Sequence, residues 1–212
     1  MNFNKHSEYE GKHALLSASK HSWLNYDDEK LINAYICSYA TTIGTLVHAY
    51  AKDKILYRQP MEDNRSEMNA LLLHLLKNDI PERVIPLESL FYNLMPYVND
   101  AIGYKMTPEQ VLYYSDYSFG TADAISYGRN VLRIHDLKTG GTPASMDQLM
   151  IYAAWFFLEY KKEVNFQKSH TELRIYQNQD IVVHTPTNSE IAAVMEKIVH
   201  GAALIETHTM EV

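Results

Sequence analysis

Two aspartates and a lysine are the residues of this sequence whose types and spacing best suit catalysis. Asp136 and Lys138 form an Asp-x-Lys string, and Asp123 precedes it in the neighbouring segment. Carboxylate oxygens are the ligands that Mg²⁺ prefers, and a cation held by them could polarise a phosphodiester and lower the pKa of a bound water. A nearby lysine could orient that water or stabilise the developing charge. The Asp-x-Lys string alone is more typical of an exposed ion pair, so this prediction depends on where Asp123 lies.

The segments that carry these residues are short, β-rich and separated by turn residues, which predicts a β-hairpin. With the turn centred on Gly128–Arg129, Asp123 faces Ile134. Because side chains alternate between the two faces of a strand, Asp136 and Lys138 then share the face of Asp123. Diagonal neighbours across two strands lie roughly 7–8 Å apart, within reach of a common metal ion. The hairpin therefore predicts one site for both acids and the lysine.

Two helical segments carry further candidates. Gln148 and Tyr152 are four residues apart in an apolar helix, so their polar groups emerge on one face. In an earlier helix, Gly44–Thr45 lies one turn before His48 and leaves room for a ligand to approach the imidazole. Each has a structural alternative: a tyrosine at the edge of the core with a satisfied hydroxyl, and a histidine that only packs in its helix.

The elements that must position these residues follow from hydrophobic periodicity. Residues 1–14 are polar and are expected to be loose. Residues 15–107 are expected to be mainly helical, 108–186 to form a sheet core with a helix at 146–160, and 188–206 to form a C-terminal helix. This order predicts a single domain over residues 1–212 of the α/β (α+β) class, with a central mixed β-sheet flanked by helices and with N-terminal helical additions.

Helices are expected from Ser17 onward, with Ser17 and Ser19 as N-caps and a break at Asn25–Asp28. Further helices are expected over residues 43–57, 68–77 and 89–104. Strands are expected over residues 111–114, 120–127, 131–137, 172–177 and 181–184. The C-terminal helix is predicted to be amphipathic, with one apolar face made of Ile191, Val194, Met195, Ile198, Val199, Ala202 and Ile205.

Composition limits the classes of function. A formal net charge of −7 argues against a protein that coats nucleic acid by bulk electrostatics, but it is compatible with one local cleft. Cys37 is the single cysteine, so a disulfide framework and a cysteine-rich zinc or iron–sulfur site are excluded within the chain. A reducing, cytoplasmic setting is expected. The chain has no apolar stretch long enough for a membrane span, and its start lacks the apolar core of a secretory signal.

Four short motifs follow one another along the chain. They are Gly-Thr-x-x-His at Gly44–His48, Gly-x-x-Asp at Gly120–Asp123, Asp-x-Lys at Asp136–Lys138 and Gln-x-x-x-Tyr at Gln148–Tyr152. In this order and spacing they resemble the RecB-like exonuclease branch of the PD-(D/E)XK nuclease superfamily. The opening at Leu16–Ser19, followed by Trp23-Leu24, is similar to that of small, phage-associated members. The resemblance extends over residues 15–205 and implies a restriction-endonuclease-like core.

The resemblance also implies a role for each matching residue. The implied ligands of a Mg²⁺ or Mn²⁺ ion are His48, Asp123, Asp136 and the backbone carbonyl of Leu137. Lys138 is the implied catalytic lysine, and Gln148 and Tyr152 are expected to line the cleft beside the scissile phosphate. The iron–sulfur relatives need four cysteines, so no such cluster is expected here. The chain also lacks a Gly-x-x-x-x-Gly-Lys-Ser/Thr loop, so it carries no helicase motor of its own.

The activity implied by the resemblance is that of a DNA exonuclease in recombination or end processing. DNA is then the substrate, and a single-strand annealing or other recombination protein is an implied partner. An endonuclease of the same fold is nearly as compatible, and RNA is a less favoured substrate. A catalytically silent nucleic-acid-binding or interaction module that retains the fold, and a plain helical interaction protein, are the alternatives from other classes. The sequence leaves the oligomeric state open.

Overall fold

The computed structural model describes residues 4–11 and 14–210, and the chain divides into two units, residues 1–42 and 43–212. The first unit holds the 3₁₀ helices η1 (Ser7–Tyr9) and η2 (Ala18–Asn25) and the helix α1 (Asp28–Ser38). The predicted loose segment, residues 1–14, falls partly on residues 1–3 and 12–13, which lie outside the described residues. The second unit carries all of the candidate functional residues.

The start of the first unit differs from its prediction. Ser17 precedes η2, but its side chain does not cap the helix; its Oγ lies 3.1 Å from the Oγ of Ser19. The segment is 3₁₀ rather than α-helical and is kinked at Lys20. The break at Asn25–Asp28 is confirmed, because Asp27 caps α1 by accepting a hydrogen bond from the N–H of Lys30.

Helices form the early part of the second unit, as predicted, and the first of them begins within the last residues of the first unit. They are α2 (Ala40–Leu56), α3 (Arg65–Leu76), the 3₁₀ turn η3 (Glu82–Val84) and α4 (Leu87–Gly103). Asn64 caps α3 through a 2.9 Å hydrogen bond from the N–H of Glu67. The buried residues of α2 recur every four positions, which turns one face of this helix inward; they are Ile43, Val47, Ala51 and Ile55.

The sheet has five strands in the order β1-β2-β3-β4-β5. Their bounds are β1 (Thr107–Ser115), β2 (Ser118–Gly128), β3 (Val131–Leu137), β4 (His170–Gln177) and β5 (Asp180–His184). β3 and β4 pair in parallel and all other neighbours are antiparallel, so the sheet is mixed. The helix α5 (Asp147–Glu159) and the short η4 (Phe166–Lys168) form the crossover that a parallel pair requires.

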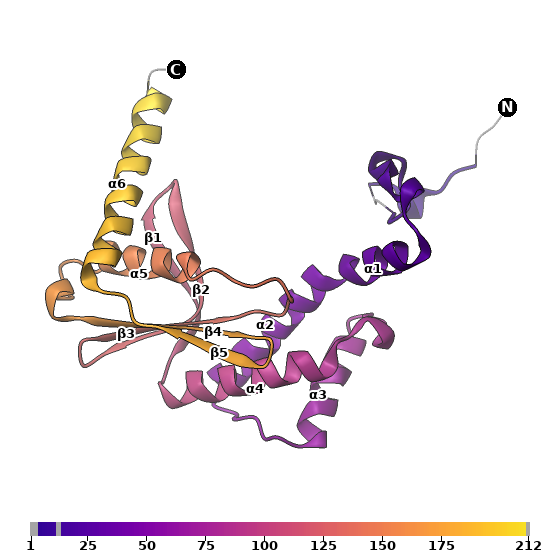
Figure 1. Cartoon of the computed structure of the whole chain (residues 1–212), viewed down its shortest axis with the longest axis horizontal. Helices are drawn as coiled ribbons and strands as arrows, with labels where there is room; N and C mark the ends of the chain where they lie inside the picture. Colours follow the sequence, from indigo (N-terminus) through magenta and orange to yellow (C-terminus); the bar gives the residue numbers. More distant parts are fainter. Residues whose placement is uncertain (1–3, 12–13, 211–212) are drawn as a thin grey trace. The chain divides into compact units, whose positions relative to one another are not determined.

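Helices cover both faces of the sheet. α5 packs on one face, where Leu132 and Ile134 of β3 join its core, and α4 packs on the other face (Figure 1). Arg174 and Tyr176 of β4 face α4, since both contact Asp100 of that helix. This is the predicted α/β class, with a central mixed sheet flanked by helices.

The register of the β2–β3 hairpin differs from the prediction. Gly128 pairs with Val131, so the turn is centred on Arg129–Asn130 rather than on Gly128–Arg129. Both central residues have left-handed backbone, with φ of 53° and 61°, as a two-residue turn that matches the twist of the strands requires. The register therefore moves by two residues, and Ile134 faces Ile125 instead of Asp123. A shift of two keeps every side chain on its predicted face.

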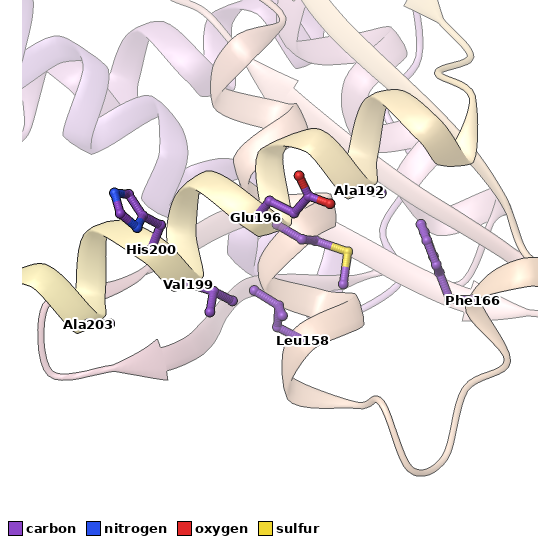
Figure 2. Close-up of a pocket in the computed structure, with 8 residues that line it drawn as sticks. Leu158, Phe166, Ala192, Glu196, Val199, His200 and Ala203 are labelled. Carbon is purple, nitrogen blue, oxygen red and sulfur yellow. The ribbon is translucent and has the colours of Figure 1, made fainter.

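The C-terminal helix α6 (Asn188–Met210) packs beside α5, but its apolar face is only partly covered. Within the predicted apolar face, Ile191 and Ala202 are buried, whereas Val199 is 41% and Ile205 44% exposed. An apolar groove runs between the two helices (Figure 2), lined by Leu158, Phe166, Ala192, Met195, Glu196, Val199, His200 and Ala203. In residues 4–11 and 14–210, no helix is long and apolar enough to cross a membrane.

Candidate metal centre

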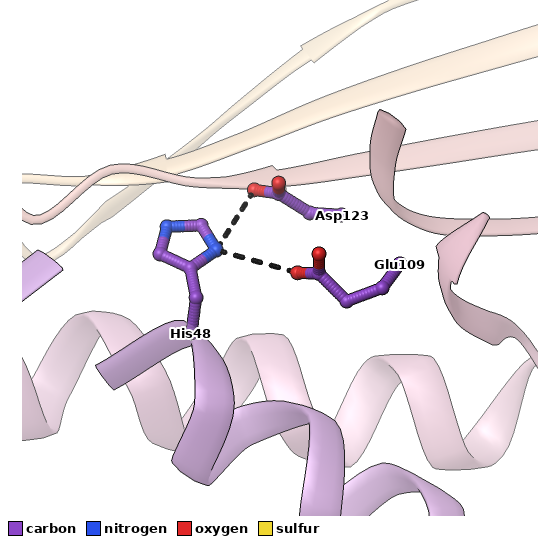
Figure 3. A group of neighbouring side chains, drawn as sticks. All are labelled: His48, Glu109 and Asp123. Atoms are coloured by element: carbon purple, nitrogen blue, oxygen red, sulfur yellow. Dashed lines mark ion pairs between the residues drawn. The ribbon is translucent and has the colours of Figure 1, made fainter. Parts of the chain in front are cut away.

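Three side chains from separate elements converge at the end of the β1–β2 hairpin that lies away from its turn. His48 comes from α2, Glu109 from β1 and Asp123 from β2 (Figure 3). The Nδ1 atom of His48 lies 3.5 Å from Oδ2 of Asp123 and 3.9 Å from Oε1 of Glu109. One ligand atom from each residue lies within 4.8 Å of the others, a spacing that suits a shared cation.

Glu109 is a member of this cluster that sequence reasoning missed. Its φ is 53°, so it adopts left-handed backbone in the middle of a strand. The pairs on either side, Pro108 with Ala124 and Gln110 with Ala122, keep one common register, which places Glu109 opposite Asp123. β1 was expected to begin only at Val111, which left Glu109 in the preceding connection. Knowledge of the β1–β2 register is the signal that would have found it.

The other predicted residues form a chain of hydrogen bonds. The ammonium of Lys138 donates to Oδ1 of Asp136 over 3.1 Å and to Oε1 of Gln148 over 2.8 Å. The amide of Gln148 donates in turn to the hydroxyl of Tyr152 over 2.9 Å. Asp-x-Lys and Gln-x-x-x-Tyr, on a strand and a helix, thus meet through Lys138 and Gln148.

Asp123 links the two groups. Its Oδ2 accepts a 2.9 Å hydrogen bond from the N–H of Leu137, the residue between Asp136 and Lys138. This contact involves the N–H of Leu137 and not its carbonyl. The role of the carbonyl as a metal ligand therefore stays a prediction. Among the described residues, Asp136 lies outside the compact group formed by His48, Glu109 and Asp123.

The ionised forms of Asp123 and Asp136 are both disfavoured by burial, and a bound cation would stabilise them. Burial raises the pKa of Asp123 to about 6; the imidazole of His48 lowers it and the charge of Asp136 raises it further. Burial also raises the pKa of Asp136, while the ammonium of Lys138 lowers it. The Oδ2 atom of Asp136 lies 2.9 Å from Lys138 but outside hydrogen-bonding geometry, so this buried oxygen has no hydrogen-bond partner among the described residues. Crowded, desolvated carboxylates of this kind favour a bound cation.

A polar groove gives access to the cluster. Its volume is about 560 Å³, and it is lined by Gly44, Thr45, His48, Ala49, Lys52, Glu109, Thr121 and Asp123. Oxygen ligands with one imidazole suit a hard divalent ion such as Mg²⁺ or Mn²⁺. The groove between α5 and α6 is mostly apolar and holds none of the candidate residues, so the polar groove is the better place for a charged substrate.

The glycines of the predicted motifs allow close packing around the site. A Cβ on Gly120 would lie 2.8 Å from the indole of Trp155, which is closer than real side chains approach. A Cβ on Gly44 would lie 3.1 Å from Oγ1 of Thr139, just after the strand that carries Asp136. Glycine at these positions lets α5 and α2 lie against the strands that carry the acids.

Behind the site, on the face covered by α4, lies a buried histidine. Nδ1 of His135 lies 3.1 Å from the hydroxyl of Tyr176, which donates to Asp100 over 2.6 Å. Burial, with the charges of Arg174 and Arg133, lowers the pKa of His135 to about 3. His135 is therefore a neutral core residue and points away from the cluster, because it adjoins Asp136 on an alternating strand.

These features define a mixed α/β protein with a histidine–carboxylate cluster that lines a polar groove. The chain belongs to the family described as protein of unknown function (DUF2800), whose model matches residues 13–203. No curated protein and no solved structure matches the chain.

Proposed function

We propose that the chain is a metal-dependent nuclease of the PD-(D/E)XK superfamily, in its RecB-like branch, that hydrolyses phosphodiester bonds of DNA. One observation carries the proposal: two of the four motifs line one polar groove, and hydrogen bonds connect the other two motifs to Asp123 in that groove. His48 and Asp123 lie 3.5 Å apart, and Asp123 is bonded to the strand whose Lys138 contacts Gln148. A surface hairpin with an incidental ion pair does not require this convergence.

The donor set suits Mg²⁺ or Mn²⁺. His48, Glu109 and Asp123 would hold the ion, and Asp136, whose Oδ2 has no hydrogen-bond partner among the described residues, lies on the neighbouring strand β3. When bound, such an ion supplies Lewis acidity and lowers the pKa of a coordinated water. The residues of the chain fix where the acids lie and keep water away from the buried carboxylate of Asp136.

Lys138 is placed to act on the reacting phosphate. An ammonium has three donors. Lys138 uses two of them toward Asp136 and Gln148, which fixes the direction of its side chain. A remaining donor can orient a water or contact a phosphate oxygen on which negative charge develops. Tyr152 holds the amide of Gln148 in place, so this tyrosine positions the lysine through its neighbour.

We favour an exonuclease acting in recombination or end processing, in a reducing cytoplasm and with a single-strand annealing or other recombination protein as partner. The exposed, single Cys37 is compatible with a reducing compartment. A phage-associated origin is proposed only from the resemblance of residues 16–24 to small, phage-associated members. An endonuclease would use the same hydrolytic residues, and the experiment below separates the two.

The test is cleavage of end-labelled linear duplex and closed-circular DNA with Mg²⁺ or Mn²⁺, using wild type beside Lys138→Ala. Lys77→Ala, which removes an exposed lysine at the end of α3, is the matched control. We expect wild type and control to degrade the linear DNA only, and Lys138→Ala to lose activity at least a hundredfold. Nicking of the circle would indicate an endonuclease. Failure of wild type to cut either DNA with either metal would reject the proposed activity.

A further inference from the structure

Lys52 lies beside the candidate metal centre, although none of the four motifs contains it. It follows His48 by four residues on α2, so the two side chains share one face of the helix. It also lines the same polar groove as Glu109 and Asp123. We propose that Lys52 binds a phosphate of the nucleic-acid strand in this groove, next to the phosphate that is cleaved, which rests on the proposed nuclease function.

The charge of Lys52 has no partner in the part of the chain that the structure describes. Its side chain is exposed, and no hydrogen bond or ion pair joins it to the described residues. Lys54, two residues further along α2, is engaged with Glu67 over 3.0 Å. Lys138, the other lysine near the acids, is held by Asp136 and Gln148. Among the described residues, Lys52 is therefore an unpaired cation in the lining of the groove.

The balance of charge shows why a free cation is needed there. Glu109, Asp123 and Asp136 contribute three negative charges when ionised. One divalent cation together with Lys138 offsets these three charges and leaves no net positive charge to attract an incoming phosphodiester. In a protein with a net charge of −7, the long-range field also repels the substrate. Lys52 supplies the next positive charge along the groove, where a flexible ammonium binds phosphate as a point charge.

Thr121 supports the same path for the strand. It lies two residues before Asp123 in β2 and lines the groove between the acids and the outer part of the hairpin. Hydroxyl groups and lysines are the common side-chain contacts to the sugar–phosphate backbone, and such contacts position a strand without reading its sequence. The inferred contact is therefore independent of base sequence.

A purely structural role for Lys52 makes a different prediction. If Lys52 only offset the repulsion between the acids, its removal would change metal binding and folding rather than the handling of DNA. The test must therefore measure both. Mn²⁺-induced thermal stabilisation reads out metal binding, and the dependence of the rate on DNA and salt concentration reads out the phosphate contact.

The experiment compares wild type, Lys52→Met, Lys52→Arg and the control Lys161→Met, which removes an exposed lysine beyond α5. On linear DNA with Mg²⁺, we expect Lys52→Met to raise KM about tenfold, leave kcat within about twofold and lower the salt slope of binding by about one. Lys52→Arg should restore most of the affinity because it keeps the charge. Stabilisation by Mn²⁺ should equal that of wild type in every variant.

Different results separate this inference from the proposed function. If wild type cleaves DNA and Lys52→Met behaves like Lys161→Met, the inference is overturned while the nuclease remains. If wild type does not cleave, binding of a labelled single-stranded oligonucleotide in Mg²⁺ is measured by fluorescence anisotropy. Weaker binding by Lys52→Met alone would then support the phosphate contact without hydrolysis, and equal or absent binding would reject it.

Discussion

Asp123 connects the histidine–carboxylate cluster to the group of hydrogen-bonded residues around Lys138. Its carboxylate lies beside the imidazole of His48 and also accepts the N–H of Leu137 in the neighbouring strand. The first contact connects it to α2 and the second to β3, which carries Asp136 and ends just before Lys138. A change at Asp123 should therefore affect metal binding, cleavage and stability in different directions, and the three effects can be measured separately.

Asp123→Asn should abolish metal-dependent cleavage and weaken metal binding. The amide oxygen can still accept the N–H of Leu137, but the residue no longer supplies a negative ligand. We expect Mn²⁺ to raise the melting temperature of wild type and to leave that of the variant nearly unchanged. Equal stabilisation of both proteins by Mn²⁺ would remove Asp123 from the metal site.

Without metal, Asp123→Asn should be more stable than wild type above pH 6. Burial raises the folded-state pKa of Asp123 from 3.8 to about 6. A raised pKa gives a contribution to stability that is complete below pH 4 and is lost as the pH rises through 6. Asparagine avoids this loss, so thermal denaturation in EDTA at pH 8 should show a higher melting temperature, by about 2–4 °C for each kcal/mol. A lower melting temperature would assign Asp123 a structural role.

Among the elements, the contact between β2 and α5 is the tightest point at the site. Gly120 lies against the indole of Trp155, whose Nε1 donates to Oγ of Ser118 over 2.8 Å. This arrangement holds α5, and with it Gln148 and Tyr152, against the strand that carries Asp123. The position of Gln148 relative to Lys138 thus depends on Gly120, which has no side chain to take part in the reaction.

Gly120→Ala should destabilise the fold by about 1–3 kcal/mol, because its Cβ would overlap a ring that cannot move without losing the bond to Ser118. Gly103→Ala, at the end of α4, is the matched control, since nothing lies within 4 Å of the added Cβ there. Urea denaturation should show a lower midpoint for the first variant only. Equal midpoints would mean that α5 adjusts freely.

At the scale of the whole molecule, two buried groups make the free energy of unfolding depend on pH in opposite directions. His135, with a folded-state pKa lowered to about 3, favours the folded state above pH 6.5 and loses that contribution as the pH falls. Asp123 adds to the stability of the folded state as the pH falls from about 6 toward its unfolded-state pKa of 3.8. In wild type the two effects partly cancel between pH 6.5 and 4, so stability changes less than either group alone would cause.

This cancellation predicts that Asp123→Asn is more sensitive to acid than wild type. The variant keeps the loss due to His135 but lacks the compensating gain. Melting temperatures recorded in EDTA from pH 7 to pH 4 should fall more steeply for the variant. Parallel curves for the two proteins would contradict the assigned pKa shifts.

The fold and the candidate site differed in how far they could be predicted from sequence. Alternation of side chains placed Asp123 and Asp136 on one face correctly, because that outcome survives a register shift of two residues. The turn itself was misplaced by one residue, since Arg129 and Asn130, rather than Gly128 and Arg129, form its centre. Such local choices depend on how two strands fit together, which a single segment does not encode.

Glu109 and the end of α6 show a second limit. A strand residue with left-handed backbone breaks the alternating pattern from which strands are recognised, so Glu109 could not be assigned to β1. The periodic apolar residues of α6 predicted one shared apolar face, yet Ile191 and Ala202 of that face are buried while Val199 and Ile205 are exposed. Periodicity indicates which residues share a face, but packing against neighbouring elements decides which of them become buried.

The left-handed backbone of Glu109 has a consequence for how this site can change over evolutionary time. Glycine adopts a φ of 53° without strain, whereas a residue with a side chain loses on the order of 1 kcal/mol there. Glycine would thus be the residue of choice if the bend of the strand were all that mattered. A lineage that no longer needs the carboxylate is free to drift to glycine and gain stability. Retention of glutamate at this position would therefore mark the relatives in which the centre still works.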